Sequence, residues 1–248
     1  MTKFRCIDLK VRPIKMINLS KNMGFLQRII LSVTQKPRRI VECYLSSNEI
    51  KKLHIGCGGN FLEGWLNTDS IPVSNKILFM DATRKLPFDD NRFDYIFSEH
   101  MIEHITYTQG GLMLSECFRV LKSGGKLRIS TPDLQFLIDL YTENNTEIQL
   151  EFIKHSSERW IKKSPHYKNA PSFHETFVIN NYMRAWGHQF IYDERVLRDL
   201  LEKVGFVKIH RVNVCESQDR CLQNLENVSR KPPGLIALES LVVDCAKP

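Results

Sequence analysis

The segment LHIGCGGN, residues 53–60, decides the fold of this chain. An apolar run typical of a buried β-strand leads directly into Gly56, Cys57, Gly58 and Gly59, so that three of the 12 glycines fall within four positions. Glycine is needed where the backbone turns tightly or where another molecule comes close to the main chain. In open α/β sheets, ligands bind at the carboxyl ends of the strands. We therefore interpret the segment as a first strand followed by a ligand-binding loop.

The sequence that follows alternates between short apolar runs rich in β-formers and longer runs with helical spacing. Helix 194–204 is expected to begin after Asp193 as N-cap and to stop at Gly205. Such alternation predicts an α/β fold, a Rossmann-like doubly wound sheet that is mostly parallel and covered on both faces. The expected strands are 52–55, 65–68, 77–80, 93–98, 126–130, 206–212 and 241–245, and the expected helices are 111–121, 134–141 and 194–204.

The composition is that of an ordinary globular protein, with 248 residues, 42% hydrophobic content and 25% charged residues. No stretch of the sequence approaches the ~18 uninterrupted apolar residues of a membrane span, so we expect a cytoplasmic protein. The seven cysteines are scattered and form no CxxC pair, which argues against a disulfide framework and against a zinc site.

The net charge of +7 is concentrated at the N-terminus. Residues 1–52 hold twelve Lys or Arg against three Asp or Glu, whereas the remainder is nearly neutral. Apolar residues from Phe25 to Val33 recur at helical spacing, and a second helical pattern, RRIVECYL, follows. We predict a basic helical extension over residues 1–50 and one domain over 51–248. The extension either packs on the domain as a lid, the interpretation we favour, or contacts an anionic membrane surface or a protein partner.

The loop does not match two common glycine-rich motifs. The GxGxxG motif for dinucleotides would need glycine at position 61, where this chain has Phe61. The phosphate-binding loop of nucleotide-binding proteins would need a following GK[ST], which is absent. Two carboxylates instead follow the next two strands. Asp69 is suited to accept hydrogen bonds from both hydroxyls of a ribose, and Asp81, with the backbone N–H of Ala82, is suited to bind adenine.

Several motifs occur in a fixed order along residues 51–133. They are GCGxN at 56–60, GWxNxD at 64–69, LPF-x-D-x-x-FD at 86–94, the Glu103-His104 pair, and RVLKxGG at 119–125. With these motifs in this order, the chain resembles the class I S-adenosylmethionine-dependent methyltransferases, in particular their type 11-like branch. The later segments HQFIYDERVLRDLLEKVGF and SLVVDCAKP fit the same resemblance.

The resemblance implies S-adenosyl-L-methionine as cofactor and an antiparallel last strand. It places the glycine loop under the methionine part of the cofactor, Asp69 at the ribose, and Asp81 with Ala82 at the adenine. His54 stands where many relatives carry an acidic residue, and the short link from Gly59 to Asp69 leaves room for a first helix of only a turn or two. The full predicted set is His54, Gly56, Cys57, Gly58, Gly59, Asn60, Asp69, Asp81, Ala82, Ser98, Glu99 and His100.

Transfer of a methyl group from a sulfonium needs alignment and, for a hydroxyl acceptor, one base. Histidine is the usual base near neutral pH. His104 is a candidate base or a structural residue capping the turn, and Asp133 is a candidate base or, as we favour, a helix N-cap. His174 and His188 lie in the long stretch 142–192, which we interpret as a substrate-side insertion. Its histidines show no i, i+4 pair and no neighbouring cysteines, so we predict no metal.

The acceptor is the least constrained part of the prediction. After the fourth strand, DNA and RNA amine methyltransferases of this fold carry Asn or Asp followed by Pro-Pro and an aromatic residue, whereas this chain has Ser98-Glu99-His100. We therefore expect O-methylation of a small-molecule, sugar or glycan-like acceptor and consider nucleic acid unfavoured. Two alternatives stay open: a nucleic-acid or protein methyltransferase recruited by the basic N-terminus, and a non-catalytic cofactor-binding module. The sequence gives no oligomeric state.

Overall fold

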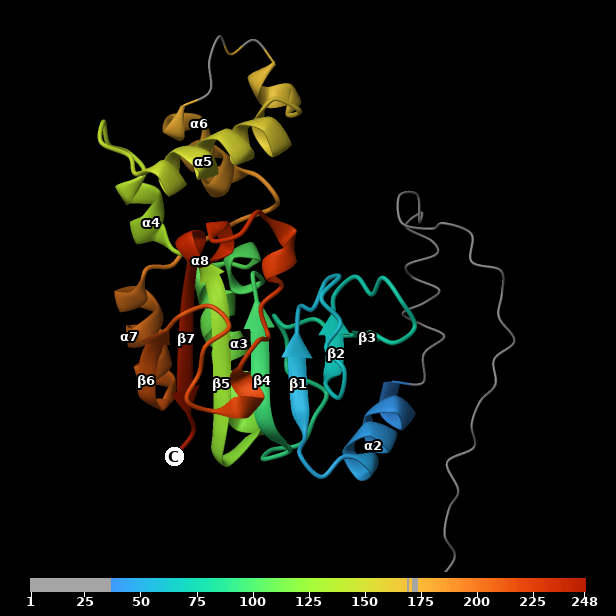
Figure 1. Cartoon of the computed structure of the whole chain (residues 1–248). Helices are drawn as coiled ribbons and strands as arrows, with labels where there is room; N and C mark the ends of the chain where they lie inside the picture. Colours follow the sequence, from blue (N-terminus) through green and yellow to red (C-terminus); the bar gives the residue numbers. More distant parts are fainter. Residues whose placement is uncertain (1–36, 169, 171–173) are drawn as a thin grey trace, which may run out of the picture.

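The computed structural model describes residues 37–168, 170 and 174–248. The predicted helix around Phe25 to Val33 lies outside these residues. The RRIVECYL pattern forms helix α2, Pro37–Ser47, as predicted. Figure 1 shows a central sheet whose strands β1, β4 and β5 point toward a group of helices that covers their carboxyl ends.

All seven predicted strands are present in one sheet, in the order β3-β2-β1-β4-β5-β7-β6. Neighbouring strands from β3 to β5 are parallel, whereas β7 runs antiparallel to both β5 and β6. This confirms the Rossmann-like doubly wound sheet with an antiparallel last strand. The strands are β1 Lys52–Ile55, β2 Leu66–Asp69, β3 Leu78–Phe79, β4 Phe93–Glu99, β5 Leu121–Pro132, β6 Val207–Val212 and β7 Ser240–Ala246.

The register brings the ends of four strands to the same edge. Ile55 of β1 pairs with Thr68 of β2 and with Ser98 of β4, and Ser98 pairs with Ile129 of β5. Because these strands are parallel, the loops after β1, β2 and β4 leave the sheet side by side. The glycine loop and Asp69 therefore meet at the edge where ligands of such sheets bind.

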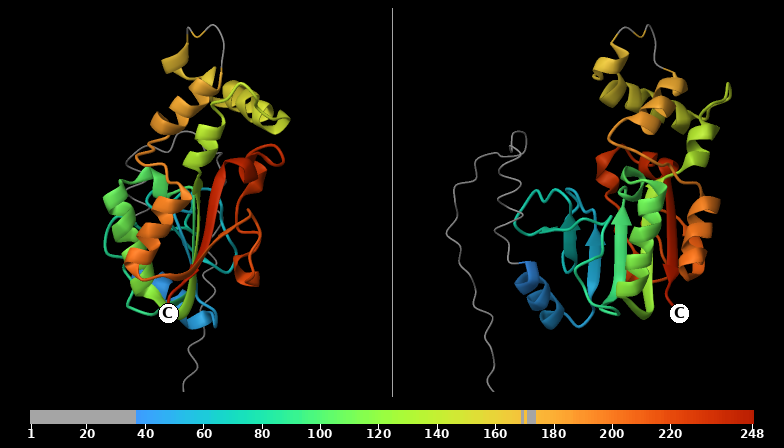
Figure 2. Two further views of the ribbon diagram at one scale, coloured as in Figure 1. Left: turned by 90° about the vertical axis from the view of Figure 1, so that its left-hand side faces the viewer. Right: turned by 180° about the vertical axis from the view of Figure 1, so that it is seen from behind.

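One face of the sheet is covered by helices α3, Tyr107–Val120, and α7, Glu194–Val204 (Figure 2). Helix α7 begins and ends as predicted, since Asp193 accepts a hydrogen bond from the Val196 N–H and Gly205 adopts φ 113°. Helix α3 begins four residues before the predicted start, at a Thr106–Gln109 capping box. Its Gly110 packs against the Tyr192 hydroxyl, which lies 2.4 Å from where a Cβ would stand.

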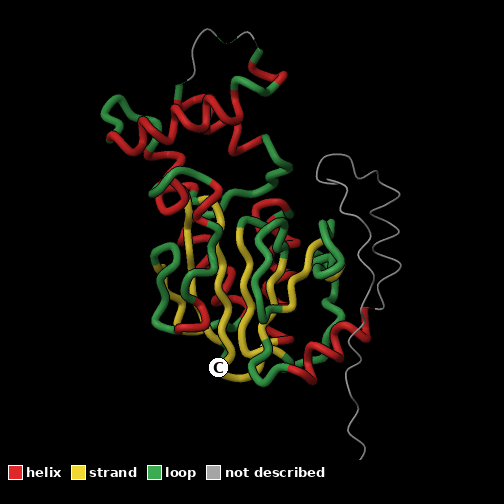
Figure 3. Tube along the Cα trace, turned by 45° about the vertical axis from the view of Figure 1, so that its right-hand side comes forward, coloured by secondary structure: helices red, strands yellow, loops and turns green. Residues whose placement is uncertain are grey.

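The opposite face is covered mainly by irregular chain. The connection 213–239 between β6 and β7 packs Leu222 and Leu225 on Trp65 and Phe97. The links β1–β2 and β2–β3 contain only turns and bends, as the tube in Figure 3 shows. The expected first helix of a turn or two is therefore wrong, because residues 56–65 are used up by the glycine loop and a second turn at Gly64. The connection 213–239 holds η4 Arg220–Leu222, η5 Val228–Arg230 and α8 Leu235–Glu239.

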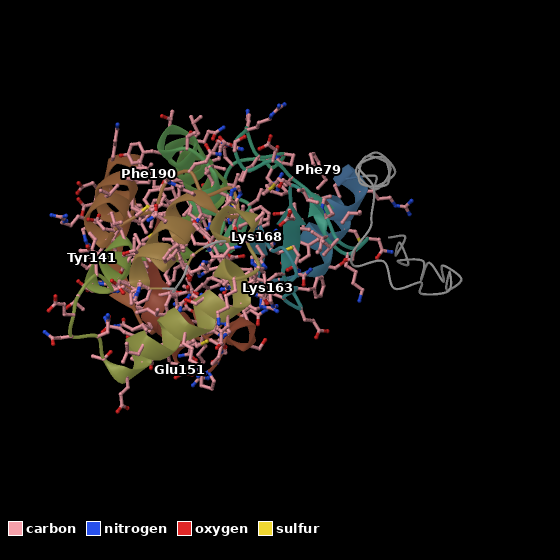
Figure 4. The ribbon with its side chains drawn as sticks, turned by 90° about the horizontal axis from the view of Figure 1, so that it is seen from above. Phe79, Tyr141, Glu151, Lys163, Lys168 and Phe190 are labelled. Carbon is pink, nitrogen blue, oxygen red and sulfur yellow. The ribbon has the colours of Figure 1, made fainter. Side chains whose placement is uncertain are left out.

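Residues 134–184 form a helical cap with its own apolar cluster, and most of this cap falls within the segment 142–192 that was interpreted as an insertion. Phe136, Phe152, Val178 and Tyr182 are among its buried residues. In the view from above (Figure 4), Tyr141 and Phe79 lie at opposite sides of the molecule, and Lys163 and Lys168 of the cap lie between them. In Figure 1 the cap lies above the carboxyl ends of β4 and β5. Its elements are α4 Leu134–Asp139, α5 Glu147–Ser156, η2 Ser157–Ile161, η3 Pro165–Tyr167 and α6 Glu175–Arg184.

Among the residues that the structure describes, no helix has both the length and the apolar composition needed to cross a membrane.

Candidate active site

The glycine loop combines an obligatory turn with an open surface. Gly56 has φ +67°, and a Cβ there would stand 2.2 Å from the Met101 side chain. At Gly58 and Gly59, in contrast, a Cβ would meet no heavy atom within 4 Å. Gly56 is thus required by the packing of Met101, whereas the bare backbone at Gly58 and Gly59 faces free space. This arrangement is the one a closely approaching ligand needs.

Cys57 lies in the same loop but contributes no reactive sulfur. Its side chain is 3% exposed, and burial raises the pKa of the thiol to about 12. The thiol is therefore protonated at neutral pH, and it does not compete as a nucleophile for an activated methyl group.

Asp69 ends strand β2 and fastens the glycine loop. Its Oδ2 accepts a hydrogen bond from the Gly58 N–H at 2.8 Å, and its Oδ1 accepts one from the Ile71 N–H at 2.7 Å. The carboxylate is half-buried, and each oxygen keeps a further lone pair for a ligand hydroxyl. The geometry is compatible with the predicted ribose contact.

Asp81 follows β3 beside Asp69, since the Met80 N–H donates to the Asp69 carbonyl at 3.0 Å. The Thr83 hydroxyl and N–H both donate to Asp81 Oδ1, and Arg84 lies 3.0 Å from Oδ2. Hydrogen bonding from Thr83, followed by the Arg84 charge, holds the pKa of Asp81 below its usual value. Ala82, the predicted adenine contact, is buried with only 9% of its surface exposed.

Asn60 and Glu99 join the loop to the connection between β6 and β7. Asn60 Nδ2 donates to Glu99 Oε2 and to the Leu225 carbonyl, both at 3.0 Å. Glu99 Oε1 accepts from the Asn227 N–H at 3.0 Å and from Arg230 at 2.9 Å. Sequence analysis missed Asn227 and Arg230, because no motif marks the segment and only its length between two strands could have indicated a role.

His54 and Ser98 are buried inside the sheet rather than exposed at the crevice. His54 is fully buried, stacks on Phe97 at 4.9 Å and lies 3.1 Å from Asn67 Oδ1 through Nδ1. Desolvation lowers the pKa of His54 to about 4, so the imidazole is neutral. Ser98 is 1% exposed, and its hydroxyl makes no hydrogen bond within the described residues. Both residues support the crevice from within the strands.

Two of the predicted catalytic residues meet in a polar cluster formed by His100, Glu103, His104 and His188. Glu103 lies in η1, Ile102–His104, directly after β4, and its carboxylate is fully buried. His100 Nδ1 is 3.3 Å from Glu103 Oε1, and the rings of His104 and His188 meet edge to face with centroids 4.8 Å apart. Because Met101 packs on Gly56, this cluster adjoins the methionine end of the predicted cofactor site.

The tautomer of His188 follows from one hydrogen bond. Its Nδ1 lies 2.6 Å from the Tyr182 carbonyl, which can only accept, so Nδ1 carries the proton and Nε2 carries the lone pair. Desolvation lowers the pKa of His188. A neutral imidazole with an available lone pair is suited to accept a proton or to bind a metal ion.

The other two candidates lie outside this cluster. Asp133 is the N-cap of α4, accepting from the Gln135 N–H at 3.0 Å, and its second oxygen is 2.7 Å from Arg211. The helix-capping role favoured from the sequence is therefore the one the structure gives. His174 is exposed at the N-cap of α6, in the cap. Of the four candidates, only His104 and His188 come together.

A separate cavity of about 310 Å³ is lined by Lys126 of β5, by residues of β6 and β7 that include His210 and Asp244, and by residues 217–219. Lys126 lies at 2.6 Å from Asp219, so its charge is already neutralised. We assign this cavity no part in the site.

Comparisons with known proteins found one matching family model and several similar solved structures. Residues 67–129 match the family model of a methyltransferase domain. The search of curated proteins found no significant match. A SAM-dependent methyltransferase from Archaeoglobus fulgidus is 18% identical, with a TM-score of 0.47, covering 89% of this chain and 94% of that one. One from Thermotoga maritima is 18% identical with a TM-score of 0.44, covering 90% and 95%.

Another similar structure is phosphoethanolamine N-methyltransferase 2 from Haemonchus contortus in complex with S-adenosyl-L-methionine. It is 17% identical, with a TM-score of 0.41, and the match covers 86% of this chain and 52% of that one. The chain therefore spans about half the length of this relative. Similarity at these levels carries no argument about the acceptor.

The match of residues 67–129 to the methyltransferase-domain model agrees with the resemblance to the type 11-like branch of the class I S-adenosylmethionine-dependent methyltransferases. The observed strand order agrees with the Rossmann-like fold which that resemblance implies.

Proposed function

We propose that the protein transfers the methyl group of S-adenosyl-L-methionine to a hydroxyl group of a small-molecule, sugar or glycan-like acceptor. The observation that carries the proposal is the position of the His104–His188 pair. This pair lies beside Met101, which packs on the glycine loop, and under the helical cap. A proton-accepting group is thus held where the sulfonium end of the cofactor would lie.

The cofactor would lie along the edge formed by the loops after β1, β2 and β3. The bare backbone at Gly58 and Gly59 would contact its methionine part, Asp69 its ribose hydroxyls, and Asp81 with Ala82 its adenine. Asn60, Glu99 and residues 225–230 would form the remaining side of the cofactor site. The protein's task in this reaction is alignment, because the methyl group is already activated by the sulfonium.

An imidazole of the pair would take the acceptor's proton as the carbon–oxygen bond forms. His188 is the better candidate, because the Tyr182 carbonyl fixes its Nε2 as the lone-pair nitrogen. The proton passes from the hydroxyl to Nε2, the methyl group passes to the oxygen, and S-adenosylhomocysteine leaves with a neutral sulfur.

The acceptor would bind between the pair and the cap. Trp160 and Trp186 are 36% and 42% exposed and pack edge to face, with ring centroids 5.5 Å apart. Trp186 also lies 5.4 Å from the ring of His188. Exposed aromatic faces beside a few polar groups are typical of sites for compact organic ligands, including sugar rings. This arrangement supports a small or glycan-like acceptor.

A thermal-shift titration tests the cofactor site. S-adenosylmethionine should raise the melting temperature by mass action, and Asp69→Ala should abolish most of the rise. Asp199→Ala, an exposed carboxylate of α7, is the matched control and should keep it. Stabilisation by NADH in place of S-adenosylmethionine would contradict the proposal. Transfer of labelled methyl groups into fractions of a cell extract would then identify the acceptor class.

A further inference from the structure

Three potential metal ligands converge at the proposed acceptor site. One ligand atom from each of Glu103, His104 and His188 lies within 4.8 Å of the others. Two adjacent ligand atoms of a tetrahedral ion bound at about 2.0–2.1 Å lie roughly 3.3 Å apart. Side-chain rotations that move each ligand atom by about an ångström would therefore bring the three atoms to binding distance of one ion. The prediction of no metal considered spacing along a single segment, whereas this set combines η1 with the link between α6 and α7.

The carboxylate of Glu103 has one oxygen without a hydrogen bond. Oε2 accepts from the Thr131 hydroxyl at 3.1 Å, but Oε1 has no hydrogen-bond partner among the described residues, although the side chain is fully buried. His100 Nδ1, at 3.3 Å, and His104 Nε2, at 4.0 Å, lie within ion-pair distance of Oε1 and can neutralise it only when they are protonated. A buried carboxylate oxygen is costly unless a cation or a donor satisfies it.

The surroundings of the three ligands hold them in place. His188 donates its Nδ1–H to the Tyr182 carbonyl, which is the outer contact that metal-binding histidines usually make. The Gln189 N–H donates to the Glu103 carbonyl at 2.7 Å, and the Gln189 side chain donates to the His104 carbonyl at 2.9 Å. These bonds join the two ligand-bearing segments without involving the ligand atoms themselves.

We propose that Glu103, His104 and His188 bind a divalent first-row transition cation. Two imidazoles and one carboxylate favour Zn²⁺, Co²⁺ or Mn²⁺ over Mg²⁺ and Ca²⁺, which prefer all-oxygen sites. The His104 side chain is 36% exposed, so a coordination position remains open toward solvent and toward an acceptor. His100, beside Glu103, would position the carboxylate.

This inference rests on the proposed methyl transfer to a hydroxyl group, but it replaces direct proton transfer to His188 by binding of the acceptor oxygen to the cation. A hydroxyl oxygen bound at the open position would lose its proton more readily, because the cation stabilises the alkoxide. The proton would pass to solvent, and the two histidines would act as ligands rather than as bases. A hydroxyl flanked by a second oxygen, as in a sugar diol, could occupy two positions.

Cobalt binding to the full chain provides the test. After removal of metals with a chelator, Co²⁺ should bind with one equivalent, giving visible d–d absorption without the near-ultraviolet charge transfer of a thiolate ligand. Zn²⁺ should displace it and Mg²⁺ should not. Thiolate absorption, or no saturable binding, would overturn the proposal, because the cysteines would then account for any metal bound.

Variants locate the site. His104→Ala and His188→Ala should each weaken Co²⁺ binding at least tenfold, on the scale of lost metal-site residues. His210→Ala, an exposed histidine of β6, should leave it unchanged. Because the His104 side chain is partly exposed, His104→Ala should fold normally, so that weaker Co²⁺ binding by this variant cannot be due to misfolding. Circular dichroism checks the fold of both variants. Equal binding by all four proteins would overturn the assignment.

The same samples separate this inference from the proposed function. A melting-temperature rise with S-adenosylmethionine but no Co²⁺ binding would overturn the metal site and leave the methyltransferase proposal standing. Co²⁺ binding without any rise in the melting temperature on addition of S-adenosylmethionine would overturn the methyltransferase proposal and leave the metal site standing. Methyl transfer that is unaffected by chelation but lost in His188→Ala would favour the base and overturn the metal.

Discussion

Glu99 Oε1 and Arg230 Nη2 form an ion pair at 2.9 Å across 131 residues of sequence. The pair, together with the Asn60 contacts, attaches the connection between β6 and β7 to the cofactor edge of the sheet. The face that helices cover in many doubly wound sheets is thereby closed by irregular chain, which is held both by these polar contacts and by the packing of Leu222 and Leu225 on Trp65 and Phe97.

Replacing Glu99 tests this attachment. Glu99→Ala removes the acceptor for Asn60, for the Asn227 N–H and for Arg230. Because the carboxylate is almost fully buried, we expect the free energy of unfolding to fall by about 1–3 kcal/mol, measured by urea denaturation. Glu202→Ala, at an exposed position of α7, should change it by less than about 0.5 kcal/mol. Equal effects would show that the connection is held by its apolar contacts alone.

The glycine loop gives a prediction that separates stability from ligand binding. Gly59 does not have positive φ, and a Cβ there meets no neighbour, so Gly59→Ala should leave the melting temperature of the free protein almost unchanged. If the cofactor contacts this backbone, the affinity for S-adenosylmethionine should fall at least tenfold in calorimetric titration.

The matched variant is Gly56→Ala, which should destabilise the free protein by at least about 1–2 kcal/mol, the cost of the left-handed conformation alone. The contact with Met101 would add to this cost, so Met101→Ala in the same chain should recover part of it. A Gly59→Ala protein that binds the cofactor normally would rule out close approach at that residue.

The buried His54 should produce a dependence of stability on pH. Its pKa is lowered from 6.5 to about 4, so the unfolded chain takes up the proton first as the pH falls. The lowered pKa does not change the free energy of unfolding above pH 6.5, lowers it progressively as the pH falls from 6.5 to 4, and lowers it by a constant amount below pH 4. The total decrease in the free energy of unfolding is about 3 kcal/mol, at roughly 1.4 kcal/mol per pKa unit.

His54→Leu isolates this contribution. Asn67 Oδ1 still accepts from the Leu62 N–H at 2.9 Å in the variant, so no acceptor is left unsatisfied. The difference in unfolding free energy between the two proteins should therefore narrow or reverse as the pH falls from 6.5 to 4, in urea denaturation at several pH values. A constant difference would mean that His54 is protonated or solvated in the folded protein.

The features that could be predicted from the sequence are those determined by residues close to one another in the chain. The alternation of apolar runs predicted all seven strands, and the Asp193 and Gly205 signals fixed both ends of α7. The start of α3 was predicted at Gly111, four residues too late, because Gly110 disfavours a helix locally and only the distant Tyr192 explains it. Contacts between distant segments, such as His188 with His104, have no local signature. Their convergence depends on how the cap folds back over the sheet.

Arg128 offers the last prediction, on the buried charges that hold the connection between β6 and β7. The side chain is fully buried on β5 and lies 2.6 Å from Glu226 and 2.9 Å from Asp244. Arg128→Met should lower the free energy of unfolding by about 3–5 kcal/mol, because Glu226 is left buried without its partner. Adding Glu226→Gln should recover part of the loss, and a coupling free energy of at least about 1 kcal/mol in the double-mutant cycle would identify the pair as the cause. Strict additivity would instead assign the loss to the other hydrogen bonds of the guanidinium, since a methionine leaves the carbonyls of Asn213 and Glu216 without the donor that Arg128 now provides.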